Sequence, residues 1–463
     1  MRLRSPWKPR LARIEANAAE RLVHALADDI IEGKLASGDR LPAHRELAWA
    51  LEIGVGTVTK AYAILERRGL TRSVKGRGTF VATHQARQGP LIDLSINTPP
   101  AILSTRLLAR SLMEVGRKVD AGHFNLYAPP AGHMEHRRIL SRWLATLGLT
   151  ADPARLVLTG GAQQALALVF NLACGHEGVL LTERLNYPGA ISLCRQMAYR
   201  MRGVEIDHEG IVPSSLADAL DAERLIGRKA VYVTPTLHNP TTATMGLERR
   251  QAIVELCRAR DAWIIEDGVY TTGAEKLPPL ASLAPERCFY VDSLSKTLSP
   301  GLRVGVLVVP PGMEQLVEAA LQAVPFSPSP LSCAVIEDWL TNGVIASLRT
   351  GLKTESLRRA KLASSLLSEQ TLICHPGAYH AWLPMPRGAA SQFAVAAAGL
   401  GIAVTSPEAV MVSPEEDDSG IRLCLGGPSL DDLTKALTLL SGLGQSRSSR
   451  SANTAGAHPE LSQ

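Results

Sequence analysis

The sequence lacks an apolar run of about 18 residues, the length that a membrane-spanning helix needs. Its first residues, MRLRSPWKPR, lack the apolar core of a secretory signal peptide. It also lacks a CxxC pair, because its 7 cysteines are scattered along the chain. These absences argue against a membrane protein, a zinc or other metal site and a disulfide framework. They favour reduced, mostly buried thiols in the cytoplasm.

The composition is otherwise ordinary, with 46% hydrophobic and 20% charged residues, and 463 residues are enough for two or three domains. The net charge of +5 is unevenly spread. Residues 1–82 contain 15 Lys and Arg against 9 Asp and Glu, whereas the rest contains 34 against 35. A positive excess confined to this segment suggests an anionic partner for it, although a solvated basic surface would have the same composition.

The first 82 residues predict three helices and a hairpin. Apolar residues recur every four positions over 18–30, which predicts an amphipathic helix ended by a glycine. The segment 43–52 predicts a second helix, and a third runs over about 57–68, after two glycines that break the chain. Two short β-prone runs over 70–82 flank a glycine-rich tip, which is a hairpin signal. This order predicts a winged helix-turn-helix.

Such a domain predicts DNA contacts from the start of its third helix, where free backbone N–H groups meet phosphates, and from its wing. An arginine on the second helix can reach a phosphate or a guanine. The candidate DNA-binding residues are Arg45 on the second helix, Thr57, Thr59 and Lys60 at the start of the third, and Lys75, Gly76 and Arg77 at the wing tip.

The segment resembles the GntR family of bacterial regulators. The resemblance is carried by GDRLP (38–42), RELA (45–48), TVTKAY (57–62) and GRGTFV (76–81). The chain departs from the family at Val55-Gly56, where Ser-Arg is frequent. The resemblance implies binding to double-stranded DNA, with a winged helix used only for protein contacts as the alternative.

The chain is expected to divide into a DNA-binding domain over 1–83, a polar linker over 84–92, a larger domain over 93–444 and a disordered tail over 445–463. Over 155–309, seven strand-like apolar runs alternate with helical stretches. This alternation predicts an α/β domain with a mostly parallel sheet, in which ligands bind beyond the carboxyl ends of the strands.

Polar residues follow several of these runs. Two glycines, ending at Gly161, precede a helix whose free N–H groups could cradle a phosphate, although many ordinary turns look the same. Asn239 follows KAVYVT and could donate a hydrogen bond to a ring oxygen, with an ordinary turn as the alternative. Asp267 ends AWIIED, where a buried carboxylate needs a partner such as a protonated pyridine nitrogen. Tyr270, three residues on, could bond a phenolate.

The stretch SLSKTLSPGLRVG, residues 293–305, places one lysine among hydroxyl residues. A lysine that attacks an aldehyde must be neutral, so its pKa must be lowered from about 10.4. Lys296 is the candidate for this role. Ser293, Ser295 and Arg303 would hold the phosphate of the same ligand, the arginine through its fork of charged donors.

This part resembles the fold-type I pyridoxal-phosphate (PLP) enzymes, specifically class I/II aminotransferases, from about Asn125 to Arg422. The resemblance implies PLP as the cofactor, a seven-stranded sheet and a smaller α+β subdomain. It implies these catalytic, cofactor and substrate roles: Lys296 as the Schiff-base lysine, Asp267 at the pyridine nitrogen, Asn239 and Tyr270 at the ring hydroxyl, Gly161, Ala162 and Gln163 at the phosphate, Tyr187 stacked on the ring, Tyr127 on the neighbouring subunit's phosphate, and Arg422 on a substrate carboxylate.

The Tyr127 role would make a homodimer obligatory. A plain exposed strand arginine is the alternative at Arg422. The chain departs from the family at Gly268, where a second acid is frequent, and at His136-Arg137, where Leu-Arg is usual.

A GntR-type winged helix followed by an aminotransferase-like domain is the pattern of MocR-type transcriptional regulators. The resemblance implies a DNA-binding regulator that senses an amino acid or amine through an aldimine at Lys296, by differential affinity for two states of a homodimer. Two alternatives stay open: an aminotransferase with an accessory DNA-binding domain, and a DNA-binding protein whose PLP domain serves only to dimerise.

Overall fold

The computed structural model describes residues 5, 7–12, 17–31, 34–35, 38–67, 70–74, 78–81, 91–118, 120–222, 227–271, 277–323, 327–413 and 415–454. The chain forms two compact units, and the main division between them falls after Pro90, inside the segment predicted as a linker. Within the described ranges, no helix is long and apolar enough to cross a membrane. Six of the seven cysteines are buried, Cys374 is half-buried, and all seven are free thiols.

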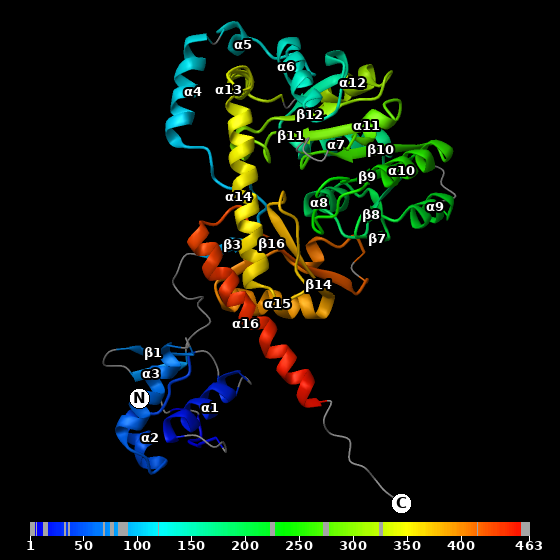
Figure 1. The fold of residues 1–463 in the computed structure, drawn as a ribbon. Helices are drawn as coiled ribbons and strands as arrows, with labels where there is room; N and C mark the ends of the chain where they lie inside the picture. The colour runs from blue at the N-terminus through cyan, green and yellow to red at the C-terminus, as the bar shows by residue number, and fades with distance from the viewer. Residues whose placement is uncertain are drawn as a thin grey trace, which may run out of the picture. The chain divides into compact units, whose positions relative to one another are not determined.

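The first unit is a winged helix-turn-helix, as predicted (Figure 1). Its elements are α1 (Ala18–Ile31), α2 (His44–Ala50), α3 (Val55–Arg67), β1 (Thr71–Val74) and β2 (Gly78–Val81). Leu22, Leu26, Leu47 and Leu65 join the three helices in one apolar core. Helix α3 begins two residues earlier than predicted, because the Gly54 carbonyl accepts the N–H groups of residues 57 and 58. The second glycine, at 56, therefore lies inside the helix and does not break it.

An N-terminal segment that the sequence analysis did not foresee packs on α1. The Trp7 indole N–H donates to Asp29 at 2.9 Å, and the Arg10 guanidinium donates to the same carboxylate at 2.6 Å. The hydrogen bond from Arg10 lowers the pKa of Asp29 to about 2. The charge of Asp29 therefore holds the segment on the helix at neutral pH.

The second unit is built on a seven-stranded sheet of order β4-β12-β11-β10-β9-β5-β6. Its strands are β4 (Leu156–Thr159), β5 (Val179–Glu183), β6 (Arg200–Val204), β9 (Lys229–Val233), β10 (Ala262–Asp267), β11 (Cys288–Ser293) and β12 (Gly305–Val308). All seven strands coincide with the predicted runs. Six of the strands run in the same direction and β12 runs opposite to them, so the predicted mostly parallel sheet is confirmed.

Helices cover both faces of this sheet (Figure 1). One face packs against α7 (Ala162–Ala173), α8 (Pro188–Gln196) and α12 (Glu314–Ala323). The other packs against α6 (Met134–Ala145), α9 (Pro213–Ala222), α10 (Leu247–Ala259) and α13 (Pro330–Thr341). Neighbouring residues alternate between the faces: Val231 belongs to the second core and Tyr232 to the first. Both faces are thus apolar, as a sheet covered twice requires.

The smaller α+β subdomain has a three-stranded sheet of β13 (Ile373–Cys374), β14 (His380–Pro386) and β16 (Asp418–Cys424). Beside it, β3 (Ile92–Leu94) pairs in parallel with β15 (Ile402–Val404). Its helices are α15 (Arg387–Gly399), α16 (Leu430–Thr454) and part of the long α14 (Val344–Leu366). The remaining elements of the unit are α4 (Thr105–Lys118), α5 (Gly122–Asn125), α11 (Leu280–Leu283), β7 (Ile206–Asp207), β8 (Gly210–Ile211) and the 3₁₀ turns Pro153–Arg155, Pro300–Leu302 and Pro407–Ala409.

One boundary prediction is wrong. The tail predicted to be disordered from residue 445 is helical as far as Thr454, because it continues α16. The first turns of α16 are anchored by Leu433, Leu437 and Leu440, which are fully buried. A helix that is already nucleated extends at the cost of one residue at a time. Residues 455–463 lie outside the described part of the chain.

Candidate cofactor and effector site

The predicted site residues gather at one edge of the seven-stranded sheet. The carboxyl ends of β4, β5, β9, β10 and β11 lie there, since these strands are parallel. The antiparallel β12 begins at the same edge, with Gly305 opposite Ser293 and Thr159. Each of these strand ends leads directly into a segment that carries a predicted cofactor residue.

Lys296 follows β11, and its amino group donates to the backbone carbonyl of Asn97. The amino nitrogen lies 6.0 Å from the ring centroid of Tyr270. Burial lowers the pKa of Lys296 to about 8, and the nearby Arg422 acts in the same direction. The residue is thus closer to the neutral amine than a lysine in water, as a nucleophile must be.

Asp267 ends β10 and is only 4% exposed. It accepts a hydrogen bond from the Tyr232 hydroxyl at 2.8 Å and one from the Val269 N–H at 3.2 Å. Burial raises the pKa of Asp267 to about 6, against the hydrogen bond from Tyr232. Among the described residues it forms no ion pair within 4 Å. A cationic ring nitrogen would supply the missing partner, so this donor and charge arrangement fits PLP.

Tyr270 and Asn239 meet beside Lys296. The Tyr270 hydroxyl accepts from Nδ2 of Asn97 at 2.8 Å and from Nδ2 of Asn239 at 3.4 Å. Burial raises the pKa of Tyr270 above its ordinary value. The Asn97 Oδ1 atom is buried and has no hydrogen-bond partner. An unpaired acceptor at this position is a polar group that a bound ligand could satisfy.

Arg422 on β16 reaches the same cluster from the smaller subdomain. Its guanidinium donates to Oδ1 of Asn239 at 2.8 Å, to Oγ1 of Thr405 at 2.9 Å and to the carbonyl of Ser95 at 2.8 Å. The side chain is buried, with 5% of Arg422 exposed, which rules out the alternative of an exposed strand arginine. The structure therefore joins residues 95, 239, 405 and 422 in one polar network.

The residues predicted to hold a phosphate meet at the start of α7. Gly161 precedes the helix with φ 112°, and no side chain caps the helix start. Arg303 crosses over it and donates to the Gly160 carbonyl at 2.7 Å. A Cβ at position 161 would lie 2.6 Å from the Arg303 guanidinium, so only glycine fits there. The Ser293 and Ser295 hydroxyls, 2.9 Å apart, complete a set of donors suited to a phosphate.

Tyr187 and Gln163 lie next to these residues. The Gln163 amide donates to the Gly189 carbonyl at 2.8 Å and so ties α7 to the start of α8. A Cβ at position 189 would overlap the Tyr187 ring, so the glycine makes room for it. Burial raises the pKa of Tyr187, and the charge of Asp267 acts in the same direction. Tyr127 is the exception among the predicted residues, because it is fully exposed, at 104%.

Besides Ser95 and Thr405 in the network of Arg422, the sequence did not reveal the site residues Tyr232, Asn97 and His380. His380 is fully buried, and burial lowers its pKa to about 3, so its ring is neutral. Its Nδ1 lies 3.0 Å from the Asn97 amide and its Nε2 lies 3.2 Å from the His238 carbonyl. The carbonyl can only accept, so Nε2 carries the proton and Nδ1 accepts from Asn97. The Asn97 contact joins residues 283 positions apart, which no local pattern reveals.

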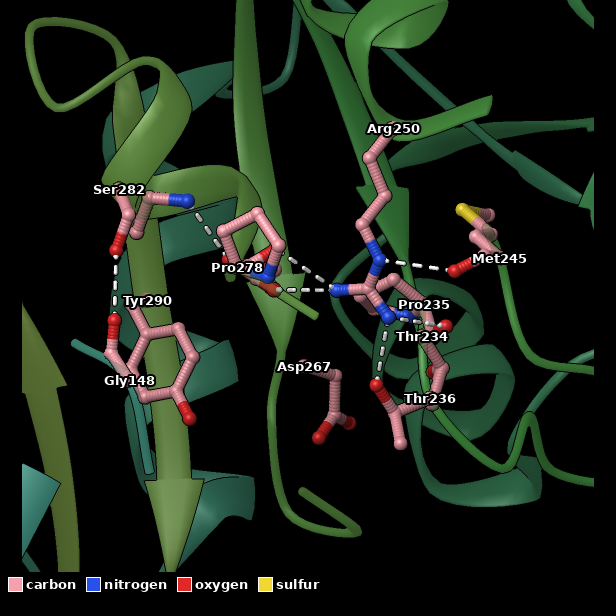
Figure 2. Close-up of polar contacts among 12 residues, drawn as sticks. Gly148, Thr234, Pro235, Thr236, Met245, Arg250, Asp267, Pro278, Ser282 and Tyr290 are labelled. Carbon is pink, nitrogen blue, oxygen red and sulfur yellow. Dashed lines mark hydrogen bonds and ion pairs between the residues drawn. The ribbon is translucent and has the colours of Figure 1, made fainter. Parts of the chain in front are cut away.

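Arg250 on α10 holds the segments that carry two of the predicted site residues. Figure 2 shows its guanidinium among oxygen acceptors: it donates to the carbonyls of Met245, Pro235 and Pro278 and to Oγ1 of Thr236, at 2.9 to 3.3 Å. Two of these acceptors begin the loop after β9 that carries Asn239. The fully buried Glu266 lies 4.0 Å from the same guanidinium. This buried pair fixes both the β9 loop and the end of β10.

The departure from the family at Gly268 has a local cause. A Cβ at this position would overlap the hydroxyl of Tyr290 on the neighbouring β11, so no acid fits there. The Tyr290 hydroxyl occupies this space and donates a hydrogen bond to Asp292 at 3.2 Å.

In the winged helix, Arg45, Thr59 and Lys60 are exposed and Thr57 is half-buried. The Thr59 hydroxyl donates to the Val55 carbonyl at 2.9 Å, which leaves its oxygen able to accept a further hydrogen bond. The predicted wing-tip contacts Lys75, Gly76 and Arg77 lie outside the described residues.

Residues 89–440 match the family Aminotransferase class I and II, and residues 18–81 match the bacterial regulatory proteins of the gntR family. The chain belongs to the class I and II aminotransferase family. With its gntR-type winged helix, it has the domain arrangement of MocR-type regulators.

Proteins similar to this chain support this assignment of its domains. The uncharacterized HTH-type transcriptional regulator YdeF of Bacillus subtilis is 26% identical over 94% of this chain and 96% of its own length. The HTH-type pyridoxine biosynthesis transcriptional regulator PdxR of Corynebacterium glutamicum is 27% identical over 61% of this chain and 63% of its own. The crystal structure of an archaeal alanine:glyoxylate aminotransferase superposes with a TM-score of 0.71 and 23% identity, over 85% of this chain and 95% of that one. This likeness shows the fold-type I architecture.

Proposed function

We propose that the protein is a transcriptional regulator that binds operator DNA as a homodimer, holds PLP at Lys296 and responds to an amino acid or amine. The observation that supports this most is the combination of a lysine with a lowered pKa and a buried, unpaired carboxylate in one chain with a gntR-type winged helix. The relatives named as transcriptional regulators favour a regulator over an enzyme.

The residues around Lys296 would each contact a different part of the cofactor. Asp267 would face the ring nitrogen, held in place by the hydrogen bond from Tyr232. Asn239 and Tyr270 would bond the ring hydroxyl oxygen, and Tyr187 would cover the ring face. The phosphate would lie in the cradle of Gly161, Ala162, Gln163, Ser293, Ser295 and Arg303, with Tyr127 of a second copy as a further contact.

PLP supplies an aldehyde carbon that reacts reversibly with primary amines. The chain's part is to present Lys296 as a neutral nucleophile, which its lowered pKa allows. Arg422 would orient an effector by its carboxylate, exchanging one of its present acceptors for the ligand. An effector regulates only through its different affinity for two states of the dimer, so the polar network around Arg422 is the element that must rearrange.

On DNA, Arg45, Thr57, Thr59 and Lys60 would contact phosphates and base edges from α2 and α3. Because phosphate contacts release counterions, affinity for the operator should fall linearly with salt on logarithmic axes. Replacing Lys60 with alanine should reduce the slope by about one unit and weaken all sequences alike.

A second function, transamination, is favoured by one observation: the half-buried Lys296 and the buried Arg422 are connected by hydrogen bonds through Asn97, Tyr270 and Asn239. In that case Lys296 would also serve as the base that moves the substrate proton. The Lys296→Ala variant separates the proposals, since a regulator should keep operator binding and lose the effector response.

The deciding experiment is a visible absorption titration of the PLP-loaded protein with a panel of amino acids and amines, paired with operator-binding measurements. A regulator should show a spectral change with one ligand class and a parallel change in DNA affinity. Loss of the absorption band that a keto acid restores would indicate transamination instead. A protein that takes up no PLP would overturn both proposals.

A further inference from the structure

A cavity of about 370 Å³ lies beside Lys296 without including it. It is bounded by α14, by the β13–β14 turn and by Thr297, the residue after the lysine. Its lining residues are Thr297, Arg349, Thr350, Leu352, Lys353, Ser356, Leu357, His375, Pro376, Gly377 and Tyr379. None of them belongs to the PLP and effector residues described above. The volume lies within the range of small-molecule sites, about 300–1,000 Å³.

The polar groups of this cavity are hydrogen-bond donors and cations. Arg349 and Lys353 are four residues apart on α14, which places them on one face of the helix. His375 accepts the Gly377 N–H through Nδ1 at 3.1 Å, so in its neutral form Nε2 carries a proton to donate. No lining residue is an acid. The cavity therefore carries positive charge that no carboxylate in its wall offsets.

Thr297 gives a second and independent indication of a ligand. The residue is 7% exposed, and its hydroxyl oxygen is buried without a hydrogen-bond partner. A buried hydroxyl without a partner carries an energetic cost, and native proteins rarely leave one so. The hydroxyls of Thr350 and Ser356, in the same wall, are both satisfied by backbone carbonyls. Thr297 thus stands apart from its neighbours.

The rest of the wall is apolar. Leu352 is 3% exposed, Leu357 is 37% exposed, and Pro376 completes this side. An inorganic ion would leave these groups without a partner. A ligand with an anionic group at one end and an apolar body at the other would match both parts of the wall.

We propose that this cavity is a second ligand site, for a small organic anion whose carboxylate or phosphate group contacts Thr297, Arg349 and Lys353 and whose apolar body packs on Leu352, Leu357 and Pro376. The site does not need the chemistry of Lys296. Because Thr297 is bonded to Lys296, a ligand there contacts the segment that carries the cofactor lysine.

The test is calorimetric titration of the full-length protein with benzoate, phenyl phosphate and uncharged benzamide. Saturable binding of at least one anion at one site per chain is expected, with benzamide at least about tenfold weaker. A preference between benzoate and phenyl phosphate identifies the anionic group. Thr297→Val, which keeps the side-chain shape, should weaken the anion about tenfold, and the double variant Arg349→Ala/Lys353→Ala should weaken it at least as much.

The matched control is Lys361→Ala, an exposed lysine further along α14 that does not line the cavity, and it should leave binding unchanged. Binding should also persist in Lys296→Ala, so a failure of the proposed PLP function would not remove it. The proposal is overturned if neither anion binds, or if binding is insensitive to Thr297→Val. It is also overturned if Arg422→Ala abolishes binding, since the probe would then lie in the effector site.

Discussion

Lys296 is a weaker base than a lysine in water, because its amine is removed from solvent and lies near the charge of Arg422. Only the neutral amine can attack the aldehyde of PLP. The rate of covalent attachment to the apo-protein should therefore rise about tenfold per pH unit at low pH and level off above a midpoint near 8. Stopped-flow absorbance between pH 6 and 10.5 would measure it.

The control for this experiment is Arg422→Gln. Removing the positive charge should move the midpoint upward, because a neighbouring cation disfavours the protonated amine. A midpoint at the pKa of an ordinary lysine in the unaltered protein would contradict the structural account of the site.

Tyr232 contacts Asp267, the residue predicted to bind the pyridine nitrogen of PLP. Its hydroxyl donates to the carboxylate and opposes the rise in pKa that burial causes. Tyr232→Phe should therefore raise the pKa of Asp267 further and weaken PLP binding about tenfold, the usual effect of one hydrogen bond to a charged group. The loss should be larger at low pH, where more of the carboxyl is protonated. Equilibrium titration with PLP at pH 6 and pH 8.5 would measure both effects.

Tyr199→Phe is the matched control, because Tyr199 is also buried but packs near His176, away from this site. It should leave PLP affinity unchanged. Equal losses in both variants would mean that Tyr232 contributes only packing.

At the scale of elements, one buried cation joins a loop to a strand. Arg250 binds the loop after β9 and lies 4.0 Å from Glu266 on β10. Arg250→Ala would leave Glu266 buried without a cation and free two acceptors near Asn239. Burial raises the pKa of Glu266 to about 7, so without the guanidinium this carboxyl would become protonated. The main loss is then the four hydrogen bonds of Arg250, and since each buried acceptor left unpaired costs about 1–3 kcal/mol, urea denaturation should show a loss of about 3 kcal/mol or more.

Arg260→Ala is the comparison for this change. Arg260 follows the same helix and pairs with Asp221 at the surface. Its loss should change stability far less, because solvent screens exposed pairs. If Arg250→Ala were equally mild, the guanidinium would not anchor the loop.

The strands of the main sheet show which features of the fold and the site local sequence pattern can predict. Most strands of the main sheet are short apolar runs, and β4, β5, β10 and β11 end at polar residues. The strands could therefore be located from local pattern, and so could Asp267, Asn239 and Lys296, which end or follow them. Tyr232 could not, because an aromatic residue inside an apolar run looks like core. Its role follows only from the pairing of β9 with β10, where Tyr232 stands opposite Ile265, two residues before the aspartate.

Other residues were missed because their partners are distant in sequence. Asn97 contacts Tyr270 across 173 positions, and such a pairing has no local signal. The start of α3 was misplaced because a glycine in a first helical turn looks like a break. In both cases the residue type alone did not predict the local structure or the contact that the folded chain forms.

At the scale of the whole molecule, Tyr127 is fully exposed and forms no hydrogen bond with the predicted cofactor residues that the structure describes. Phe124 and Leu126, which are close to it in the sequence, are also exposed, at 52% and 77%. An apolar surface of this kind is suited to a second copy. If Tyr127 completes the partner's site, hybrid dimers of one Lys296→Ala chain and one Tyr127→Ala chain should hold one site of unaltered PLP affinity.

Co-expression with two affinity tags would isolate the hybrid, and PLP titration would count its sites. The Tyr127→Ala homodimer is the reference and should bind PLP more weakly at both sites. Full affinity in that homodimer would show that the tyrosine does not act across the dimer.

Helix α14 joins the two parts of the second unit. Its first turns pack through Ile345 and Leu348 into the core of the main sheet. Near its other end, Arg359 donates to the carbonyls of Leu425, Gly426 and Pro428, just beyond the strand that carries Arg422. A helix of 23 residues is about 34 Å long. A tilt of about 5° at its start would move Arg359, which lies about 22 Å along the helix, by about 2 Å. Such a displacement is enough to break the hydrogen bonds of Arg359 to the segment after β16, so a change in the main sheet could reach the strand that carries Arg422.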